Sequence, residues 1–295
     1  MPRIRLSENF RAVFYAPFYA TLALGHFASE GVEVDLVASP SPGAATAGLL
    51  DGSLDVSWGG PMRVMKARNE ADGPPVVAFC EVVRRDPFYL VARPGVDRFG
   101  LGDLPHLRFA SVSEVPTPWL CLQHDLREIG IDPASLTRIP DRTMPANLAA
   151  LANGSLDVAQ MFEPFAARAE RERVGHVVHA ASARGETSYT TFLATRASIE
   201  RNRDAFAAMT RAVGHTQAWL ASHGAADLAG VVGGFYPDVD SADLVAAFTR
   251  YRQARLWAAD TTVSRVGFDR LAQSLRSGGF IAEIPTYEDC VVNLI

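Results

Sequence analysis

Nearly the same seven-residue run occurs twice in this chain, as LDGSLDV at residues 50–56 and as ANGSLDV at residues 152–158. In both copies a helical stretch rich in Ala and Leu precedes a glycine, Gly52 or Gly154. A helix is expected to end there, because glycine adopts the left-handed backbone conformation at little cost. The apolar residues that follow are typical of a short buried strand. We therefore expect two related halves, each with a helix, a glycine stop and a strand.

Strands and helices are expected to alternate around both copies. In the first half we predict a strand at residues 3–9, a helix at 16–30, a strand at 32–37 and a loop at 39–43. Each repeated strand leads into a further helix that begins at a proline, at Pro61 (helix 61–71) or at Pro164. Such alternation favours mostly parallel sheets, in which loops at the carboxyl ends of the strands hold ligands.

The length of 295 residues suits two α/β lobes. We predict a discontinuous first lobe, residues 1–93 and 190–295, and a second lobe, residues 94–189. The strand at 88–93 belongs to the first lobe in this scheme. The chain would cross between the lobes near 92–95 and 187–192, forming a hinge. The C-terminal third reads as mostly helical, and we expect it to pack on the first lobe.

The composition excludes several classes of protein. It is 48% hydrophobic and 21% charged, without an apolar run long enough to cross a bilayer, so direct membrane insertion is not expected. The net charge of -5 and the lack of a basic stripe argue against a nucleic-acid partner. Three scattered cysteines match neither a zinc site nor a disulfide scaffold.

The N-terminus lacks the apolar core and the cleavage site of a signal peptide. We expect a cytoplasmic protein if Met1 is the native start, and a periplasmic one if a signal peptide was trimmed.

Aromatic residues crowd the first loop, residues 9–19, directly after the first strand. Phe10, Phe14 and Tyr15 could stack on a planar ligand, whereas the alternative is that they form the buried face of the next helix. Trp58 and Gly59 follow the first repeat, where a ligand could approach the backbone. Trp58 could instead fill the interior of the lobe.

Four more polar or aromatic residues lie where loops are expected to end at the cleft. Thr117 and Trp119 stand at a helix start, where Thr117 could bind a ligand or simply cap the helix. Arg85 could bind a carboxylate or sulfonate, or could lie in a solvated turn paired with Asp86. Glu163 could cap a helix, receive a ligand amine or contact the other lobe.

No catalytic or metal-binding motif is present among the familiar serine, P-loop, zinc or CxxC patterns. Cys80 and Cys121 could reach the cleft, with His124 as a base one helical turn beyond Cys121, but small core residues are the favoured interpretation. We therefore predict no catalytic residues, no metal and no cofactor.

The motifs resemble those of the nitrate/sulfonate/taurine-type solute-binding proteins of ABC importers and the related pyrimidine-precursor binding proteins and synthases. The residues that carry the resemblance are FYAP at 14–17, GHFASEGVEV at 25–34, GSLDV at 52–56, LREIGIDP at 126–133, and GSLDV at 154–158 leading to Glu163-Pro164. The resemblance implies a type II periplasmic-binding-protein fold that closes on a small ligand. It also implies that Tyr189, like Glu163, lies near the closing edge.

Three functions follow as hypotheses. The leading one is binding of a small anionic or heteroaromatic organic solute by closure of the two lobes, with an ABC importer permease as a partner if the protein is exported. The second is a cytoplasmic enzyme on the same fold, of the pyrimidine-precursor synthase, desulfinase or decarboxylase/lyase type. The third is a ligand-sensing role. The cysteine patterns of the known enzymes are absent here, so the enzyme question leans toward no.

Overall fold

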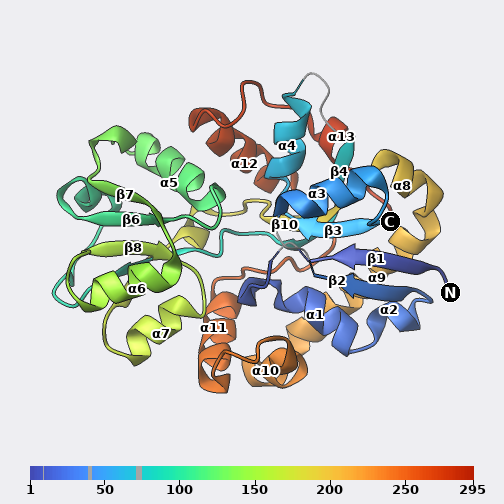
Figure 1. Cartoon of the computed structure of the whole chain (residues 1–295), viewed down its shortest axis with the longest axis horizontal. Coiled ribbons are helices and arrows are strands. Elements are labelled where there is room, and N and C mark those ends of the chain that lie inside the picture. Colours follow the sequence, from blue (N-terminus) through green and yellow to red (C-terminus); the bar gives the residue numbers. More distant parts are fainter. Residues whose placement is uncertain (9, 39–41, 71–74) are drawn as a thin grey trace.

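Ten strands form two sheets of five in the computed structural model, which describes residues 1–8, 10–38, 42–70 and 75–295. The first sheet has the order β2-β1-β3-β10-β4 and the second has the order β7-β6-β8-β5-β9. Each sheet is the centre of one lobe, and the two lobes lie side by side (Figure 1). We call them the first and the second lobe. The strands of the first sheet are β1 (Arg3–Ser7), β2 (Glu33–Val37), β3 (Val56–Gly59), β4 (Val76–Val83) and β10 (Thr190–Thr195). Those of the second are β5 (Tyr89–Ala92), β6 (Phe109–Val112), β7 (Arg138–Arg142), β8 (Val158–Met161) and β9 (His176–Ala180).

The two sheets have the same topology. In the first, β1 pairs in parallel with β2 and β3, and β10 runs antiparallel between β3 and β4. In the second, β6 pairs in parallel with β7 and β8, and β5 runs antiparallel between β8 and β9. The prediction of two related α/β halves with mostly parallel sheets is confirmed.

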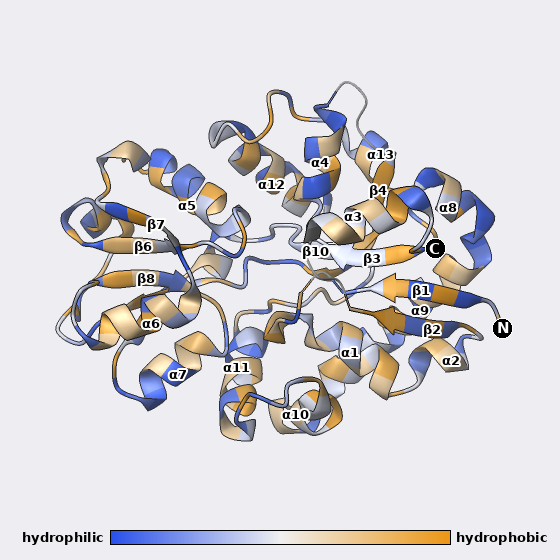
Figure 2. Ribbon diagram, in the orientation of Figure 1, coloured by the Kyte–Doolittle hydropathy of each residue, from blue (hydrophilic) through white to orange (hydrophobic). Residues whose placement is uncertain are grey.

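Helices cover both sheets, and along them hydrophobic and hydrophilic residues alternate, as expected for helices with one buried face (Figure 2). Before the second lobe the helices are α1 (Ala16–Ala23), α2 (His26–Ser29), α3 (Pro42–Asp51) and α4 (Met62–Arg68). The second lobe adds α5 (Thr117–Glu128), α6 (Met144–Ala152) and α7 (Phe165–Arg171). The C-terminal part adds α8 (Arg196–Arg201), α9 (Arg203–Ser222), α10 (Ala225–Val232), α11 (Ser241–Gln253), α12 (Arg265–Ser277) and α13 (Tyr287–Cys290). In the described part of the chain no helix has both the length and the apolar character needed to cross a bilayer.

The glycine stops behave as expected, with one correction. Gly52 and Gly154 follow α3 and α6 with φ angles of +77° and +73°. The helix expected over residues 16–30 is two helices, because Gly25 (φ +71°) interrupts it between α1 and α2. Asn9, residues 39–41 of the expected loop and Ala71 at the end of the expected helix lie outside the described residues.

The repeated run also creates the same ion pair in both lobes. Arg5 on β1 donates from its backbone N–H, Nε and Nη2 to Asp55, and from Nη2 to the carbonyl of Gly52. Arg108, directly before β6, makes the same four hydrogen bonds to Asp157 and Gly154. In the second lobe Arg93 adds a bond to Asp157 at 2.8 Å. In each lobe this ion pair connects the segment that follows α3 or α6 to β1 or to the residue before β6, the strand that has parallel neighbours on both sides.

The boundary between the lobes differs from the predicted one. The strand at 88–93 was assigned to the first lobe, but β5 pairs with β8 and β9 of the second sheet. The chain therefore crosses from the first lobe to the second through residues 84–88 and returns through residues 181–189. The antiparallel strand of each sheet directly follows a crossing: β5 follows the first one and β10 follows the second. The two crossing segments are joined where the Thr187 N–H bonds the Arg84 carbonyl (2.8 Å).

The C-terminal helices were expected to pack on the first lobe, and in the structure they contact both lobes. α12 packs on α5, and α11 packs on α7, both of the second lobe. Figure 1 shows α11 and α12 on opposite sides of the crossing segments. At the first lobe, α10 packs on α1, and the Trp257 indole N–H bonds the Phe14 carbonyl (2.9 Å). The C-terminal part thus links the two lobes beside the hinge.

Asp86 is a buried carboxylate within the first crossing segment. Its side chain is 1% exposed; Oδ1 accepts a bond from the Phe88 N–H (3.0 Å), and Oδ2 has no partner among the described residues. Burial raises the pKa of Asp86 to about 6, although the guanidinium of Arg184 opposes this shift. Ionised Asp86 therefore costs folding free energy.

The substitution Asp157→Asn tests the repeated ion pair. Asn cannot accept the charge-assisted bonds from Arg108 and Arg93, so we expect a loss of about 2 kcal/mol in the free energy of unfolding. Urea titration monitored by circular dichroism measures it, with Asp97→Asn, an exposed position in the same lobe, as the control. Equal stability of the two variants would contradict the role given to this pair.

The substitution Asp86→Asn tests the buried carboxylate through its pH dependence. Because the folded pKa lies above the unfolded one, the wild-type protein loses stability as pH rises from 4 to 6, by about 3 kcal/mol for two pKa units. The variant lacks this titration, so we expect its stability relative to wild type to increase over this range. Urea titrations at pH 4, 5, 6 and 7 measure the difference. The exposed variant Asp269→Asn should follow wild type, and a constant difference for Asp86→Asn would contradict the assignment.

Candidate functional site

A small cavity lies between the two lobes, at the carboxyl ends of β1 and β3 and at the start of α5. Its volume is about 30 Å³, enough for little more than one or two water molecules. Five of the residues predicted to contact a ligand line it, namely Phe10, Phe14, Tyr15, Thr117 and Tyr189. They come from the first loop, from the start of α5 and from the end of the second crossing segment. A cavity of this volume is too small for an organic solute.

The aromatic residues of the first loop pack together and line the cavity at the same time. Phe14 and Tyr15 are 1% and 3% exposed, and Phe10 is half-buried. The ring of Phe10 lies 6.1 Å from that of Phe14, 5.4 Å from that of Tyr15 and 6.4 Å from that of Phe162 in the second lobe. The two interpretations of these rings, as core and as cavity wall, are therefore compatible.

A buried carboxylate fixes the base of this loop. Glu8, directly after β1, accepts bonds from the Tyr19 hydroxyl (2.5 Å) and from Arg11 (2.9 Å). Only 6% of Glu8 is exposed. Because α1 carries Tyr19, these bonds tie the loop to the helix that follows it.

Arg63 also lines the cavity, and the sequence analysis did not single it out. It lies on the first turn of α4 and is half-buried. Burial lowers its pKa from the usual value, and among the described residues no carboxylate forms an ion pair with it. A partly desolvated guanidinium without a carboxylate partner is a binding group for an anion. The only hint in the sequence is its place two residues after Pro61, beside the predicted ligand loop.

Two polar groups of the second lobe and the crossing segment face the same cavity. The Thr117 hydroxyl donates to Sδ of Met62 in the first lobe at 2.7 Å, and no side chain caps the start of α5. Tyr189 is 7% exposed, and its hydroxyl has no hydrogen-bond partner among the described residues. Its backbone N–H bonds the Val83 carbonyl (2.9 Å), so the ring is held in place. Arg63, Thr117 and Tyr189 together supply donors from three parts of the fold.

Five predicted ligand residues lie elsewhere. Trp58 is fully buried and stacks on Phe18 at 4.6 Å, which is the interior position considered as its alternative. Gly59 is buried in β3, and a Cβ there would lie 3.1 Å from Leu193. Trp119 packs on Phe109 of β6, away from the cavity.

Arg85 is the fourth. Its Nη1 donates to the carbonyl of Ser182 (3.1 Å), which joins the two crossing segments. Asp86 was the alternative partner suggested by the sequence, but among the described residues it forms no ion pair with Arg84 or Arg85. Arg84 instead bonds Glu81 (2.6 Å) and Asp260 (2.9 Å).

Glu163 contacts α11 of the C-terminal part rather than the cavity. It is fully buried, forms a short ion pair with Arg250, and accepts a bond from the Ala167 N–H of α7 (2.9 Å). Arg250 also pairs with Glu170, which accepts a bond from the Val177 N–H of β9 (3.3 Å). Burial raises the pKa of Glu163 although Arg250 opposes the shift. Glu163 therefore holds α7 and α11 together.

The cysteines are poorly placed for nucleophilic catalysis. Cys80 and Cys121 are buried, and burial raises the pKa of both thiols, that of Cys121 to about 12. The Nδ1 of His124 lies 3.2 Å from the Ser277 hydroxyl on α12, and its pKa is lowered by burial. Within the described residues no cluster of three or more His, Cys, Asp or Glu side chains is arranged to hold a metal ion.

Comparisons with known proteins agree with this architecture. Residues 91–232 match the model of the NMT1-like family. The chain is 25% identical over 293 residues, 99% of its length, to the protein named "Putative binding protein YtlA" from Bacillus subtilis (strain 168), of which 88% is covered.

Solved structures show the fold. The periplasmic aliphatic sulphonate binding protein SsuA from Escherichia coli has a TM-score of 0.75 at 15% identity, over 99% of this chain and 97% of that one. The alkanesulfonate-binding protein SsuA from Xanthomonas axonopodis pv. citri, bound to MOPS, has a TM-score of 0.73 at 13% identity, over 99% of both chains. The periplasmic nitrate-binding protein NrtA from Synechocystis PCC 6803 has a TM-score of 0.65 at 14% identity, over 83% of this chain and 69% of that one.

The chain therefore has the two-lobed periplasmic-binding-protein fold, and its resemblance to the nitrate/sulfonate-type solute-binding proteins of ABC importers is confirmed.

Proposed function

We propose that this protein binds a small organic anion between its two lobes and that the acidic group of this solute lies against Arg63. The observation that carries the proposal is the guanidinium itself. It lines an interlobe cavity, is partly desolvated, and has no carboxylate partner among the described residues. Burying a cation without a counter-charge costs free energy, and an anionic solute would supply that charge.

The other hydrogen-bond donors of the cavity also suit the acidic group of the solute. Among the described residues, the buried Tyr189 hydroxyl has no partner, and the Thr117 hydroxyl bonds only a thioether, which is a weak acceptor. A carboxylate or sulfonate oxygen is a stronger acceptor than sulfur. The uncapped start of α5, a helix of 12 residues, adds a favourable dipole for negative charge. The rings of Phe10, Phe14 and Tyr15 can pack against the rest of the solute.

Closure of the lobes accounts for the small size of the cavity. Thr117 and Met62 belong to different lobes and touch across it, so their separation would open the site. We propose that the solute enters the open form and that closure brings Arg63 and the start of α5 onto it. The solved structures with the same fold include binding proteins for sulfonates and nitrate, which supports an acidic ligand.

We also propose a role in import. A binding protein that delivers a solute to the permease of an ABC importer works outside the cytoplasm, and we propose this location and partner for the chain. The enzyme hypothesis is not favoured, because the two thiols considered for it are buried with raised pKa values. Uptake of a labelled solute, compared between cells with and without the gene, tests the role in import separately from binding.

The substitution Arg63→Gln tests the binding site. We expect the dissociation constant for an acidic solute to rise about 10- to 100-fold, because one charge-assisted contact is lost. Isothermal titration with a panel of alkane- and arenesulfonates, the matching carboxylates and nitrate measures it.

Two controls accompany this test. Arg98→Gln removes the same charge at an exposed position of the second lobe and should leave affinity unchanged. Circular dichroism and the urea midpoint establish that Arg63→Gln is folded. A folded variant with wild-type affinity for every bound acid would refute the site.

A further inference from the structure

A second, larger cavity lies next to the small one, and the ring of Phe10 lines both. Its volume is about 700 Å³, within the range of cavities that hold organic ligands of drug size. Its walls come from the first loop, from the starts of α6 and α7 in the second lobe, and from residues 235–243 of the C-terminal part. It is therefore also an interlobe cavity, and we call it the outer compartment.

The outer compartment is mainly apolar near Phe10. The residues that form this wall are Phe10, Val13, Met144, Phe162, Phe165 and Val239. Phe162 and Phe165 are 6.4 Å apart, and Phe162 also packs on Phe14 of the small cavity at 5.2 Å. Phe10 is half-buried and forms part of the wall of both spaces, so the two spaces adjoin at this ring.

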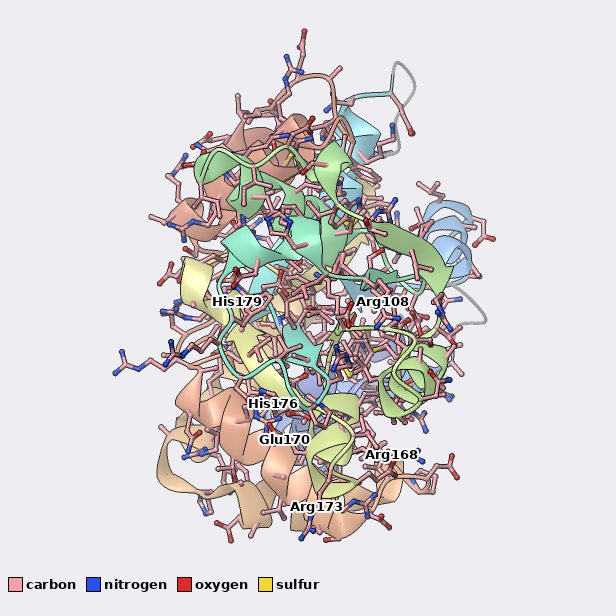
Figure 3. All side chains as sticks on the ribbon, turned by 90° about the vertical axis from the view of Figure 1, so that its left-hand side faces the viewer. Arg108, Arg168, Glu170, Arg173, His176 and His179 are labelled. Carbon is pink, nitrogen blue, oxygen red and sulfur yellow. The ribbon has the colours of Figure 1, made fainter. Side chains whose placement is uncertain are left out.

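The arginines of the outer compartment are already paired, in contrast to Arg63. Arg11 pairs with Glu8, and Arg168 pairs with Glu172. Arg171 pairs with both Asp240 and Asp243. Figure 3 shows Arg168 and Glu170 on different sides of α7, and of the two only Arg168 lines the compartment. Among the described residues that line the compartment, no cation is left without a carboxylate partner to attract a second acidic group.

Two exposed carboxylates, those of Glu114 and Asp238, lie at the rim of the outer compartment and disfavour a second acidic group there. Glu114 bonds the backbone N–H of Met144 (2.9 Å) and the Ser113 hydroxyl, and among the described residues neither Glu114 nor Asp238 has an arginine partner. Their charge would repel a negative group on a solute that extends from the small cavity.

We infer that the outer compartment receives the body of the solute, so that the ligand is a monoanion with a bulky, uncharged, apolar body. This inference rests on the proposed function, since the acidic group is placed at Arg63. An inorganic oxyanion would use only the small cavity and would gain nothing from the apolar wall. A ring system attached to one acidic group would bury its apolar surface against Phe10, Phe162 and Phe165.

A series of ligands that share a sulfonate group but differ in the rest of the molecule tests the inference. Isothermal titration compares methanesulfonate, hexanesulfonate, naphthalene-2-sulfonate and naphthalene-2,6-disulfonate on the wild-type protein. We expect affinity to rise at least tenfold from methanesulfonate to naphthalene-2-sulfonate, and the disulfonate to bind at least tenfold more weakly than the monosulfonate. Equal affinities along the series, or tighter binding of the disulfonate, would overturn the inference.

The substitution Val239→Trp fills the compartment from a half-buried loop position, and Val266→Trp at an exposed position of α12 is its matched control. We expect Val239→Trp to weaken naphthalene-2-sulfonate at least tenfold and to leave methanesulfonate unchanged, while the control changes neither. Phe165→Ala, which removes part of the wall, should also weaken only the bulky ligand. Circular dichroism and urea midpoints establish folding of each variant.

The outcomes separate the two proposals. Suppose that all the sulfonates bind and that Arg63→Gln weakens the binding of each. If Val239→Trp and Phe165→Ala then affect small and bulky ligands equally, the role given to the outer compartment is wrong, whereas the proposed binding site at Arg63 is retained. If no acid binds the wild-type protein, or if Arg63→Gln changes nothing, the proposed function fails and this inference fails with it.

Discussion

The arrangement of the two lobes depends on one buried carboxylate, that of Glu81 near the end of β4. It is 0% exposed and accepts bonds from Arg84 (2.6 Å), from the Ser188 hydroxyl (2.5 Å) and from the Ser264 N–H (3.1 Å). These donors belong to the first crossing segment, to the second one and to the C-terminal part. A buried charge is tolerated only when such partners surround it, and loss of one partner typically costs about 3–5 kcal/mol. The carboxylate therefore fixes three chain segments where the lobes meet.

This constraint determines what can move. The crossing segments are held at the first lobe by Glu81, and the second lobe is held from two sides, by α12 on α5 and by α11 on α7. Rotation of the second lobe must therefore change those helix contacts, including the pair of Glu163 with Arg250, as well as bend the crossing segments. Closure is then a coupled hinge and shear movement, in which packed helices slide while the crossings bend.

Local sequence rules predicted the features that depend on neighbouring residues. Gly52 and Gly154 end helices because the backbone there needs a positive φ angle, and the repeated run indicated two halves of equal topology. These rules failed where pairing between distant segments determines which sheet a strand belongs to. β5 has an apolar sequence that suits either sheet, and only its pairing with β8 and β9 places it in the second lobe. The ion pair of Arg108 with Asp157 likewise joins residues 49 positions apart.

The same distinction explains the candidate site. Phe10, Phe14 and Tyr15 line the cavity because they follow β1, and Thr117 because it starts α5, which a pattern can indicate. Tyr189, directly before β10, also lines it, but only the family resemblance pointed to it. Trp58 is at a strand end as well, but its ring turns into the core against Phe18, and strand position alone does not give that direction. Arg63 could not be found from the pattern, since its place at the cavity and its lack of a carboxylate partner among the described residues depend on how distant segments pack. Three other arginines near the cleft, Arg11, Arg84 and Arg250, have carboxylate partners. Among the described residues these three cations have carboxylate partners and Arg63 at the interlobe cavity has none, which is why the proposed solute is an anion.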